Sequence, residues 1–345
     1  MSNKNLFIAG TRPEIIKISP VLNKLNAKIM LTGQHYKKEM SEDFLPLIKP
    51  SEVINLSLEE FKNFNINRLS ISEILKKEIL NTNVDNVFVL GDTNTTLVGA
   101  IAAKAANKRL LFIESGLRTS DLEQVEEYNR LIVSHLADIN FCNHKNNVNN
   151  LINEGIDNKK IKLTGSTVFS ALKNLNISYD KTNSEDFILL TLHRPENVDD
   201  DSRLQDIIES LKEVNHKIIF PIHPRTKNKI ETYKSIDLNH IEIIDPIDYK
   251  SFVGFIKKSK FIISDSGGLQ EEAMILRKPL LIPRKYTERP EMLDIFNLLT
   301  YDTKILVKEA NSLINGSSNL SETVNNSPLL YGEDEVIEKI INTIK

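Results

Sequence analysis

Ionisable and glycine-rich segments follow nearly every apolar run that could form a buried strand. Ligands of open parallel sheets bind beyond the carboxyl ends of the strands, so catalytic and binding groups are expected at these positions. A sheet with a purely structural role would carry interchangeable turn residues there, and the coincidence therefore predicts an active site in a cleft. The segments lie at 10–14, 91–93, 114–118, 193–197, 223–225 and 265–268.

Three carboxylates are the sharpest of these signals. Asp92 and Glu114 end consecutive predicted strands, so they are expected to face one crevice. Glu126 lies four residues before Arg130, a spacing that places both side chains on one face of a helix and lets them pair. A single carboxylate is usually solvated or caps a helix, but three around one cleft with Lys17 are typical of acid and base catalysis.

Two turns that open helices are candidate anion sites. Ser266, Gly267 and Gly268 precede a predicted helix, where free backbone N–H groups and the helix dipole favour a diphosphate. An ordinary helix cap would explain the serine equally well, and the paired glycines favour close approach of a ligand. Arg12 stands at the start of an earlier predicted helix, where a cation opposes the dipole unless an anion binds there.

Further polar groups fall near the same strand ends. Glu272 lies about two turns into the predicted helix, where it could accept hydrogen bonds from ribose hydroxyls. His193 and His223 each end a predicted strand; such a histidine is often structural, although both stand in unusually polar surroundings. His35 is a further candidate for the cleft, whereas Cys142 is interpreted as a buried thiol without a catalytic role.

Composition excludes several classes of protein. A chain of 345 residues with 40% apolar and 26% charged side chains is typical of a soluble globular protein of two domains. A net charge of -3 does not suggest a nucleic-acid or membrane-surface partner, and one cysteine rules out a disulfide framework. No apolar run approaches the ~20 residues of a membrane helix, and the run at 6–8 is too short for a signal peptide. We therefore expect a cytoplasmic protein.

Missing motifs disfavour several enzyme mechanisms. No two of the 12 glycines are separated by a single residue, so the dinucleotide-binding fingerprint is absent. No glycine precedes a lysine, no serine stands in a nucleophile elbow, and no HExxH sequence occurs. A nicotinamide enzyme, a P-loop ATPase, an α/β-hydrolase and a zincin are all disfavoured, and no metal is expected.

Short apolar runs alternate with amphipathic stretches, a pattern typical of βαβ units and parallel sheets. We expect an α/β chain of two doubly wound, Rossmann-like domains with a cleft between them. The expected domains are 1–170 and 171–330, with a linker at 174–185, a loop at 311–327 and a final segment at 331–345. Strands are expected at 6–9, 28–32, 87–90, 110–113, 139–142, 161–163, 187–192, 217–221, 241–244, 261–264 and 279–282, and helices at 14–25, 66–80, 97–106, 126–136 and 333–344.

Seven motifs resemble those of the non-hydrolysing UDP-N-acetylglucosamine 2-epimerases. They are GTRPEIIK at 10–17, TGQH at 32–35, GDTNT at 91–95, ESGLRT at 114–119, EEYNR at 126–130, DSGGLQEE at 265–272 and TERPE at 287–291. They follow the family order across most of the chain and are jointly specific. The resemblance implies a GT-B-like fold, a final helix that returns to the first domain, and a homodimer. It further implies reversible conversion of UDP-GlcNAc to UDP-ManNAc without an added cofactor.

The resemblance also implies roles for individual residues. The UDP portion would be held by Arg12, His223, Ser266, Gly267, Gly268, Glu272 and Arg289, with Phe252 against the uracil. The sugar would be surrounded by Lys17, Asp92, Glu114, Glu126, Arg130 and His193.

The chemistry explains this set of side chains. The C2 hydrogen lies beside an acetamido group and is not acidic, so direct proton exchange is too slow. Elimination of UDP across C1–C2, protonation on the opposite face and re-addition of UDP require a base and an acid on different sides of the ring. Cations must also hold the leaving diphosphate. The sequence leaves open which carboxylate removes the proton.

Several segments depart from the family pattern. HRPEN at 193–197 stands where HRREN is frequent, IHPRT at 222–226 replaces VHxNP, and Val125 replaces a proline. These variants resemble branches that act on other UDP-2-acetamido sugars. Lys37 replaces a glutamine of the segment that binds an activator in bacterial relatives, so we expect weak or absent activation by UDP-GlcNAc.

Four other functions stay open. The chain could be an epimerase of another UDP-2-acetamido sugar, or a hydrolysing relative that releases UDP and ManNAc. A GT-B glycosyltransferase would share the diphosphate site but would need an acceptor. A UDP-sugar-binding regulator would not need Asp92, Glu114 and Glu126 together.

Overall fold

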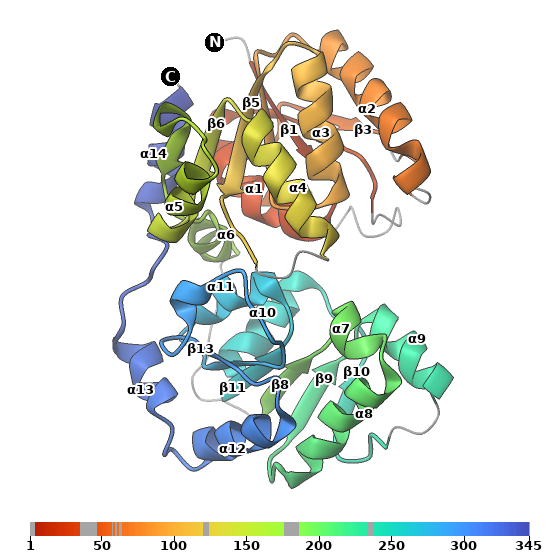
Figure 1. The fold of residues 1–345 in the computed structure, drawn as a ribbon, viewed down its shortest axis with the longest axis vertical. Helices are drawn as coiled ribbons and strands as arrows, with labels where there is room; N and C mark the ends of the chain where they lie inside the picture. The colour runs from red at the N-terminus through yellow and green to blue at the C-terminus, as the bar shows by residue number, and fades with distance from the viewer. Residues whose placement is uncertain are drawn as a thin grey trace. The chain divides into compact units, whose positions relative to one another are not determined.

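The computed structural model describes residues 4–34, 47–56, 58, 61, 64–119, 124–175, 186–233 and 237–344. The chain divides into two compact units, one of Met1–Leu175 with Leu330–Lys345 and one of Asn176–Leu329 (Figure 1). His35, Lys37 and most of the expected linker lie outside the described residues. No helix in the described part of the chain is long and apolar enough to cross a membrane.

The first unit is built on a parallel sheet with the strand order β3-β2-β1-β4-β5-β6-β7. Successive strands run outward from β1 in one direction and from β4 in the other, so the order reverses between these two. That reversal is the point at which doubly wound sheets bind ligands. The strands are β1 (Asn5–Ala9), β2 (Lys28–Leu31), β3 (Glu52–Asn55), β4 (Asn86–Leu90), β5 (Arg109–Ser115), β6 (Ile139–Cys142) and β7 (Ile161–Leu163).

Helices cover both faces of this sheet. The first-unit helices are α1 (Arg12–Leu25), α2 (Phe64–Asn81), α3 (Asn94–Ala105), α4 (Val125–Leu136), α5 (Lys145–Asn153), α6 (Val168–Asn174) and α14 (Glu335–Ile344). Figure 1 shows α2, α3 and α4 side by side, and their buried side chains, such as Leu75, Val98 and Val133, share one apolar core with β1, β4 and β5. Helix α1 packs against α6 and α14, which buries the apolar stripe of the last helix.

The second unit has a parallel sheet with the order β10-β9-β8-β11-β12-β13, which reverses between β8 and β11. Its strands are β8 (Ile188–Thr191), β9 (Ile218–Pro221), β10 (Glu242–Ile244), β11 (Phe261–Ser264), β12 (Leu280–Ile282) and β13 (Asn297–Leu299). Its helices are α7 (Pro195–Val198), α8 (Asp201–Ser210), α9 (Pro224–Tyr233), α10 (Tyr249–Lys258), α11 (Gly267–Ile275), α12 (Thr303–Ile314) and α13 (Asn319–Asn326). Two doubly wound α/β units confirm the expected fold class.

Every expected strand is present, with ends that differ by at most two residues. Strands β3 and β13 were not expected; each is a short edge strand of its sheet. The loop expected at 311–327 is wrong, since this segment contains the end of α12 and all of α13. Ser318 caps α13, and Leu320 and Val324 bury one face, so the Asn and Ser residues that suggested a loop lie mainly on the outer surface.

Candidate active site

Glu14 joins the turns that follow β1 and β4 in the first unit. Its buried Oε2 accepts hydrogen bonds from the backbone N–H groups of Gly10 and Thr11, both at 2.8 Å. Its Oε1 accepts from the hydroxyls of Thr93 at 2.5 Å and Thr96 at 3.1 Å. Burial raises the pKa of Glu14, although these hydrogen bonds oppose the shift. Sequence reasoning assigned Glu14 no role, and the TxxE capping-box pattern was the available signal.

Arg12 and Asp92 stand directly beside the residues that Glu14 binds. Arg12 is the first residue of α1, half-buried at the carboxyl end of β1. Asp92 is half-buried in the turn after β4, and its backbone carbonyl accepts a hydrogen bond from Asn129 Nδ2 at 2.8 Å. Both predicted site residues therefore lie at the point where the strand order reverses.

Lys17 and Glu114 form a close ion pair. Lys17 Nζ lies 2.8 Å from each carboxylate oxygen of Glu114. Glu114 is 6% exposed and has a backbone φ of 66°, in the left-handed region that side chains other than glycine rarely adopt. The strand pairing of β5 with β6 shifts between Ile113 and Ser115, so a bulge places this carboxylate. Strain of this kind, which costs about 1–3 kcal/mol, is found mainly at functional sites.

Arg130 connects two carboxylates. One terminal nitrogen donates a hydrogen bond to Asp92 Oδ2, and the other donates to Glu127 Oε2 at 2.8 Å. Arg130 thus forms ion pairs with Asp92 and with Glu127, whereas its pairing with Glu126, which the four-residue spacing suggested, stays a prediction. Side chains three apart on a helix also lie together, and Glu127 is the buried member of the two glutamates.

Asp265 organises the corresponding edge of the second sheet. This fully buried carboxylate accepts hydrogen bonds from the backbone N–H groups of His193 and Arg194 and from Asn197 Nδ2, at 3.0–3.1 Å. His193 Nδ1 lies 3.1 Å from Asp265 Oδ1. Burial alone would raise the pKa of Asp265, but these partners outweigh burial and hold the pKa below its ordinary value. Sequence reasoning placed Asp265 in the candidate anion-binding turn and gave it no separate role.

The predicted anion-binding groups of the second unit meet at the same sheet edge. The rings of His193 and His223 have centroids 5.4 Å apart. Ser266 is the N-cap residue of α11. A β-carbon on Gly267 would lie 1.8 Å from Glu288 Oε1, so any other residue there would require the buried Glu288 side chain to move. Gly268 follows in the first turn of α11, where backbone N–H groups have no partner within the helix.

The remaining predicted nucleotide contacts have partners within the second unit. Arg289 is 2% exposed and binds Glu271 Oε1 through Nη2 at 2.6 Å. Glu272 accepts a hydrogen bond from the Tyr249 hydroxyl at 2.5 Å. Phe252 is half-buried and packs against the apolar core of the unit.

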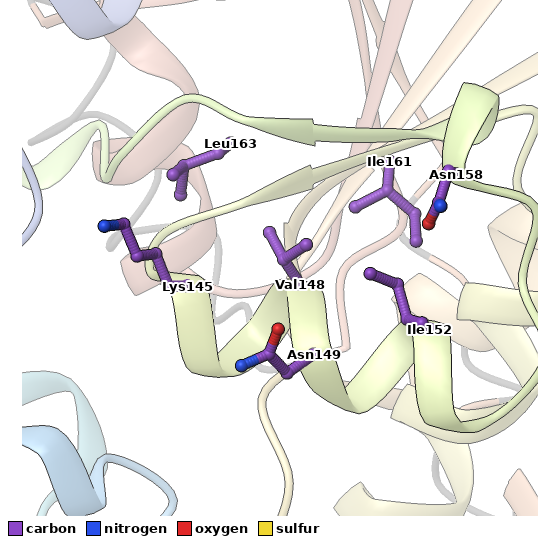
Figure 2. Close-up of a pocket in the computed structure, with 7 residues that line it drawn as sticks. All are labelled: Lys145, Val148, Asn149, Ile152, Asn158, Ile161 and Leu163. Atoms are coloured by element: carbon purple, nitrogen blue, oxygen red, sulfur yellow. The ribbon is translucent and has the colours of Figure 1, made fainter.

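A separate hollow lies between α5 and the edge strand β7, lined by apolar side chains such as Ile152, Ile161 and Leu163 (Figure 2). None of the predicted site residues lines this hollow. The groups with potential chemistry lie instead at the carboxyl ends of the two sheets. In the first unit they are carboxylates paired with cations, and in the second they are histidines, glycines and a helix N-terminus.

Comparisons with known proteins identify the family of this chain. Residues 21–345 match the sequence model of the family described as UDP-N-acetylglucosamine 2-epimerase. A UDP-N-acetylglucosamine 2-epimerase of Methanococcus maripaludis is 40% identical over 313 residues, which cover 84% of this chain and 85% of the relative. A UDP-2,3-diacetamido-2,3-dideoxy-D-glucuronate 2-epimerase of Pseudomonas aeruginosa is 33% identical over 98% of each chain.

The fold of the whole chain also matches a solved structure. The crystal structure of Methanocaldococcus jannaschii UDP-GlcNAc 2-epimerase, in complex with UDP-GlcNAc and UDP, has a TM-score of 0.83 and 32% identity over 99% of both chains. This likeness and the two parallel sheets confirm the GT-B-like class. With the family match over most of its length, the chain belongs to the UDP-N-acetylglucosamine 2-epimerase family of enzymes.

Proposed function

We propose that this protein interconverts UDP-GlcNAc and UDP-ManNAc by eliminating and re-adding UDP, without hydrolysis. The observation that carries the proposal is the presence of two carboxylate–cation pairs at the carboxyl ends of adjacent strands. Glu114 is paired with Lys17 after β5, and Asp92 is paired with Arg130 after β4. A β-carbon on Gly91 would lie 3.9 Å from Glu114 Oε2, so Glu114 lies next to the turn that carries Asp92.

Two carboxylates suit the two proton transfers of the reaction. A carboxylate removes the proton from C2 while the C1–O bond breaks and its electron pair leaves with UDP. An acid on the opposite face then returns a proton to C2 of the unsaturated sugar, and a UDP oxygen attacks C1. We assign these transfers to Asp92, Glu114 and Glu126, with Lys17 and Arg130 holding charge near the reacting atoms.

We assign the diphosphate of UDP first to groups of the second unit. The N-terminus of α11 at Ser266, Gly267 and Gly268 offers N–H groups and a favourable dipole to a diphosphate. His193 lies beside Asp265, which directly precedes Ser266, and the ring of His223 lies next to that of His193. We assign His223 to the phosphate oxygens and His193 to the sugar.

The remaining assignments to UDP follow from the resemblance. In the first unit, Arg12 can neutralise diphosphate charge. Glu272, Phe252 and Arg289 are assigned to the rest of the UDP portion, with Phe252 against the uracil. The homodimer and the cytoplasmic location stay predictions.

A second sugar is a specific alternative. The Pseudomonas aeruginosa relative, whose name gives a UDP-diacetamido-glucuronate as its substrate, aligns with 98% of this chain. The sequence also carries Pro195, Arg225 and Thr226 where the family frequently has arginine, asparagine and proline. Both sugars are UDP-2-acetamido compounds, and the same elimination chemistry applies to both.

One NMR experiment separates these functions. Purified protein is incubated with UDP-GlcNAc alone, and the anomeric protons are followed with time. UDP-ManNAc approaching an equilibrium ratio supports the proposal, whereas free ManNAc with UDP indicates a hydrolysing enzyme. An unchanged UDP-GlcNAc signal overturns the choice of sugar, and UDP-2,3-diacetamido-glucuronate is then the next substrate. A transferase would turn over only when an acceptor is added.

A further inference from the structure

Glu127 is a buried carboxylate for which the proposed reaction has no use. Its side chain is 3% exposed and lies on the inner face of α4, beside Asn129 and Arg130. Oε2 accepts hydrogen bonds from Arg130 Nη1 at 2.8 Å and from the backbone N–H of Thr119 at 3.2 Å. A buried carboxylate is costly unless it is paired, so this position is built around its partners.

The partners form a chain of alternating charges that ends at Asp92. Arg118 Nε lies 3.8 Å from Glu127 Oε1, and Arg118 also binds both oxygens of Glu154 at 2.7 Å. On the other side of Glu127, Arg130 forms ion pairs with both Glu127 and Asp92. Exposure of the side chains rises from 3% for Glu127 to 31% for Asp92. Asp92 is therefore the most exposed member of this series of charges, and it is the one that we assign to the substrate.

Two independent contacts attach α4 to the Asp92 turn. Asn129 Nδ2 holds the backbone carbonyl of Asp92, while Arg130 holds its carboxylate. A guanidinium bound on one side only can rotate about its long side chain. Glu127 fixes the other terminal nitrogen, and its bond to Thr119 N ties the same carboxylate to the loop that follows Glu114.

We propose that Glu127 is a positioning residue that orients Arg130, and through Arg130 sets the direction of the Asp92 carboxylate toward the sugar. Glu127 touches neither substrate nor reacting atoms in this proposal, which rests on the proposed epimerase function. Its neighbour Glu126 is the glutamate assigned to the sugar. The two adjacent glutamates thus have different roles in this proposal. Glu127 binds Arg130, and Glu126 is assigned to the sugar.

The test compares Glu127→Gln with Glu154→Gln in the full-length protein. Glu127→Gln keeps the size and one acceptor oxygen but removes the charge that faces both arginines. Misplacing a reacting group by about 1 Å can cost about 100-fold in rate, so we expect kcat to fall between about tenfold and about 100-fold. KM for the UDP-sugar and the Kd for UDP should stay within about twofold, because binding of UDP uses other groups.

Glu154→Gln is the matched control. Glu154 belongs to the same series of charges but binds Arg118. Arg118 and Glu127 therefore separate it from Arg130 and Asp92. Its loss should change kcat by less than about twofold, even if the melting temperature falls as much as in Glu127→Gln. Equal losses of kcat in the two variants, or unchanged kcat in Glu127→Gln, would overturn the proposal.

A spectroscopic readout makes the test independent of turnover. Guanidinium resonances of Arg130, assigned with Arg130→Lys, should be sharp in the wild type and in Glu154→Gln but broadened by rotation in Glu127→Gln. If the wild type converts no UDP-2-acetamido sugar, the proposed function fails, and this signal alone decides whether Glu127 positions Arg130. If Glu127→Gln does not fold, Glu127→Asp, which keeps the charge but withdraws it by one methylene, replaces it with the same expectations.

Discussion

Lys17 Nζ lies 2.8 Å from both carboxylate oxygens of Glu114, although 97 residues separate them in the sequence. The lysine comes from the second turn of α1 and the glutamate from the bulged end of β5. Their contact puts a cation against a carboxylate whose backbone is held in the left-handed region. The pair therefore contributes both to the stability of the first unit and to its proposed chemistry.

Glu114→Gln should reduce both activity and stability. We expect kcat to fall at least about 100-fold, since a proton-transferring group is lost. The free energy of unfolding should fall by up to about 3 kcal/mol, because Lys17 is left mostly buried without its carboxylate partner. Steady-state kinetics and urea denaturation of the same preparation measure the two effects.

The double variant Lys17→Met/Glu114→Gln separates these two effects. Removing both charges should restore much of the lost stability while activity stays absent. Recovery of activity in the double variant would mean that Glu114 serves only to neutralise Lys17.

Asp92→Asn should behave differently from Glu114→Gln. Asp92 is 31% exposed and Arg130 keeps Glu127 as a partner, so the free energy of unfolding should change by less than about 1 kcal/mol. The value of kcat should nevertheless fall about 100-fold or more. UDP affinity measured by calorimetry is the control, and a large loss of stability would assign Asp92 a structural role instead.

Solvent hydrogen should enter the sugar during turnover. Elimination leaves a planar C2, and the proton that returns on the opposite face comes from a group in exchange with water. In heavy water, NMR should therefore show deuterium at C2 of UDP-ManNAc from the first turnover. Product that keeps the original hydrogen at C2 would exclude the elimination route.

Asp265 should make stability depend on pH in the acid range. Its hydrogen bonds outweigh burial and hold its pKa below the ordinary value of about 3.9, so the unfolded chain binds the proton more tightly than the native protein. The ionised Asp265 carboxylate contributes its full stabilisation when the pH lies above its pKa in the unfolded chain. This stabilisation is lost as the pH falls through the lower pKa of Asp265 in the native protein. Urea denaturation between about pH 6 and about pH 2 should show a smaller slope with pH in Asp265→Asn than in the wild type.

The same variant should impair His193. The amide that replaces the Asp265 carboxylate has one acceptor oxygen in place of two for the N–H groups of His193 and Arg194. The His193 ring then loses its fixed position, so a fall in kcat is expected. A loss of about 2 kcal/mol in unfolding free energy should accompany it. For the stability prediction, the contrary outcome is a free energy of unfolding that varies with pH in the same way in Asp265→Asn and in the wild type. Another group would then govern the loss of stability in acid.

Cys142 should be inert in the native protein. Burial raises the pKa of its thiol to about 12, although Arg118 acts in the opposite direction. The thiolate that reacts with iodoacetamide is therefore scarce near neutral pH and enclosed as well. Mass spectrometry should find no alkylation of the folded chain and complete alkylation in urea. Rapid labelling of the folded protein would show that this region opens readily.

The sequence by itself determined the strands of the two sheets that carry the site and the residues at their carboxyl ends. Central parallel strands are buried on both faces, so their apolar runs are visible locally, and the turn that follows each run is adjacent in the chain. This is why local patterns alone suffice to place Arg12, Asp92, Glu114 and Asp265 at sheet ends. The resemblance of the motifs to one enzyme family used the same local information.

Only the tertiary structure decided which of these residues are partners. A four-residue spacing suggested Glu126 for Arg130, but which of two adjacent glutamates faces inward depends on how α4 packs against the sheet. The edge strands β3 and β13 form through pairing with distant segments and carry no strong pattern of their own. The roles of Glu14, Glu127 and Asp265 likewise arise from donors that folding brings to them, because a buried carboxylate is stable only where distant parts of the chain supply its hydrogen bonds.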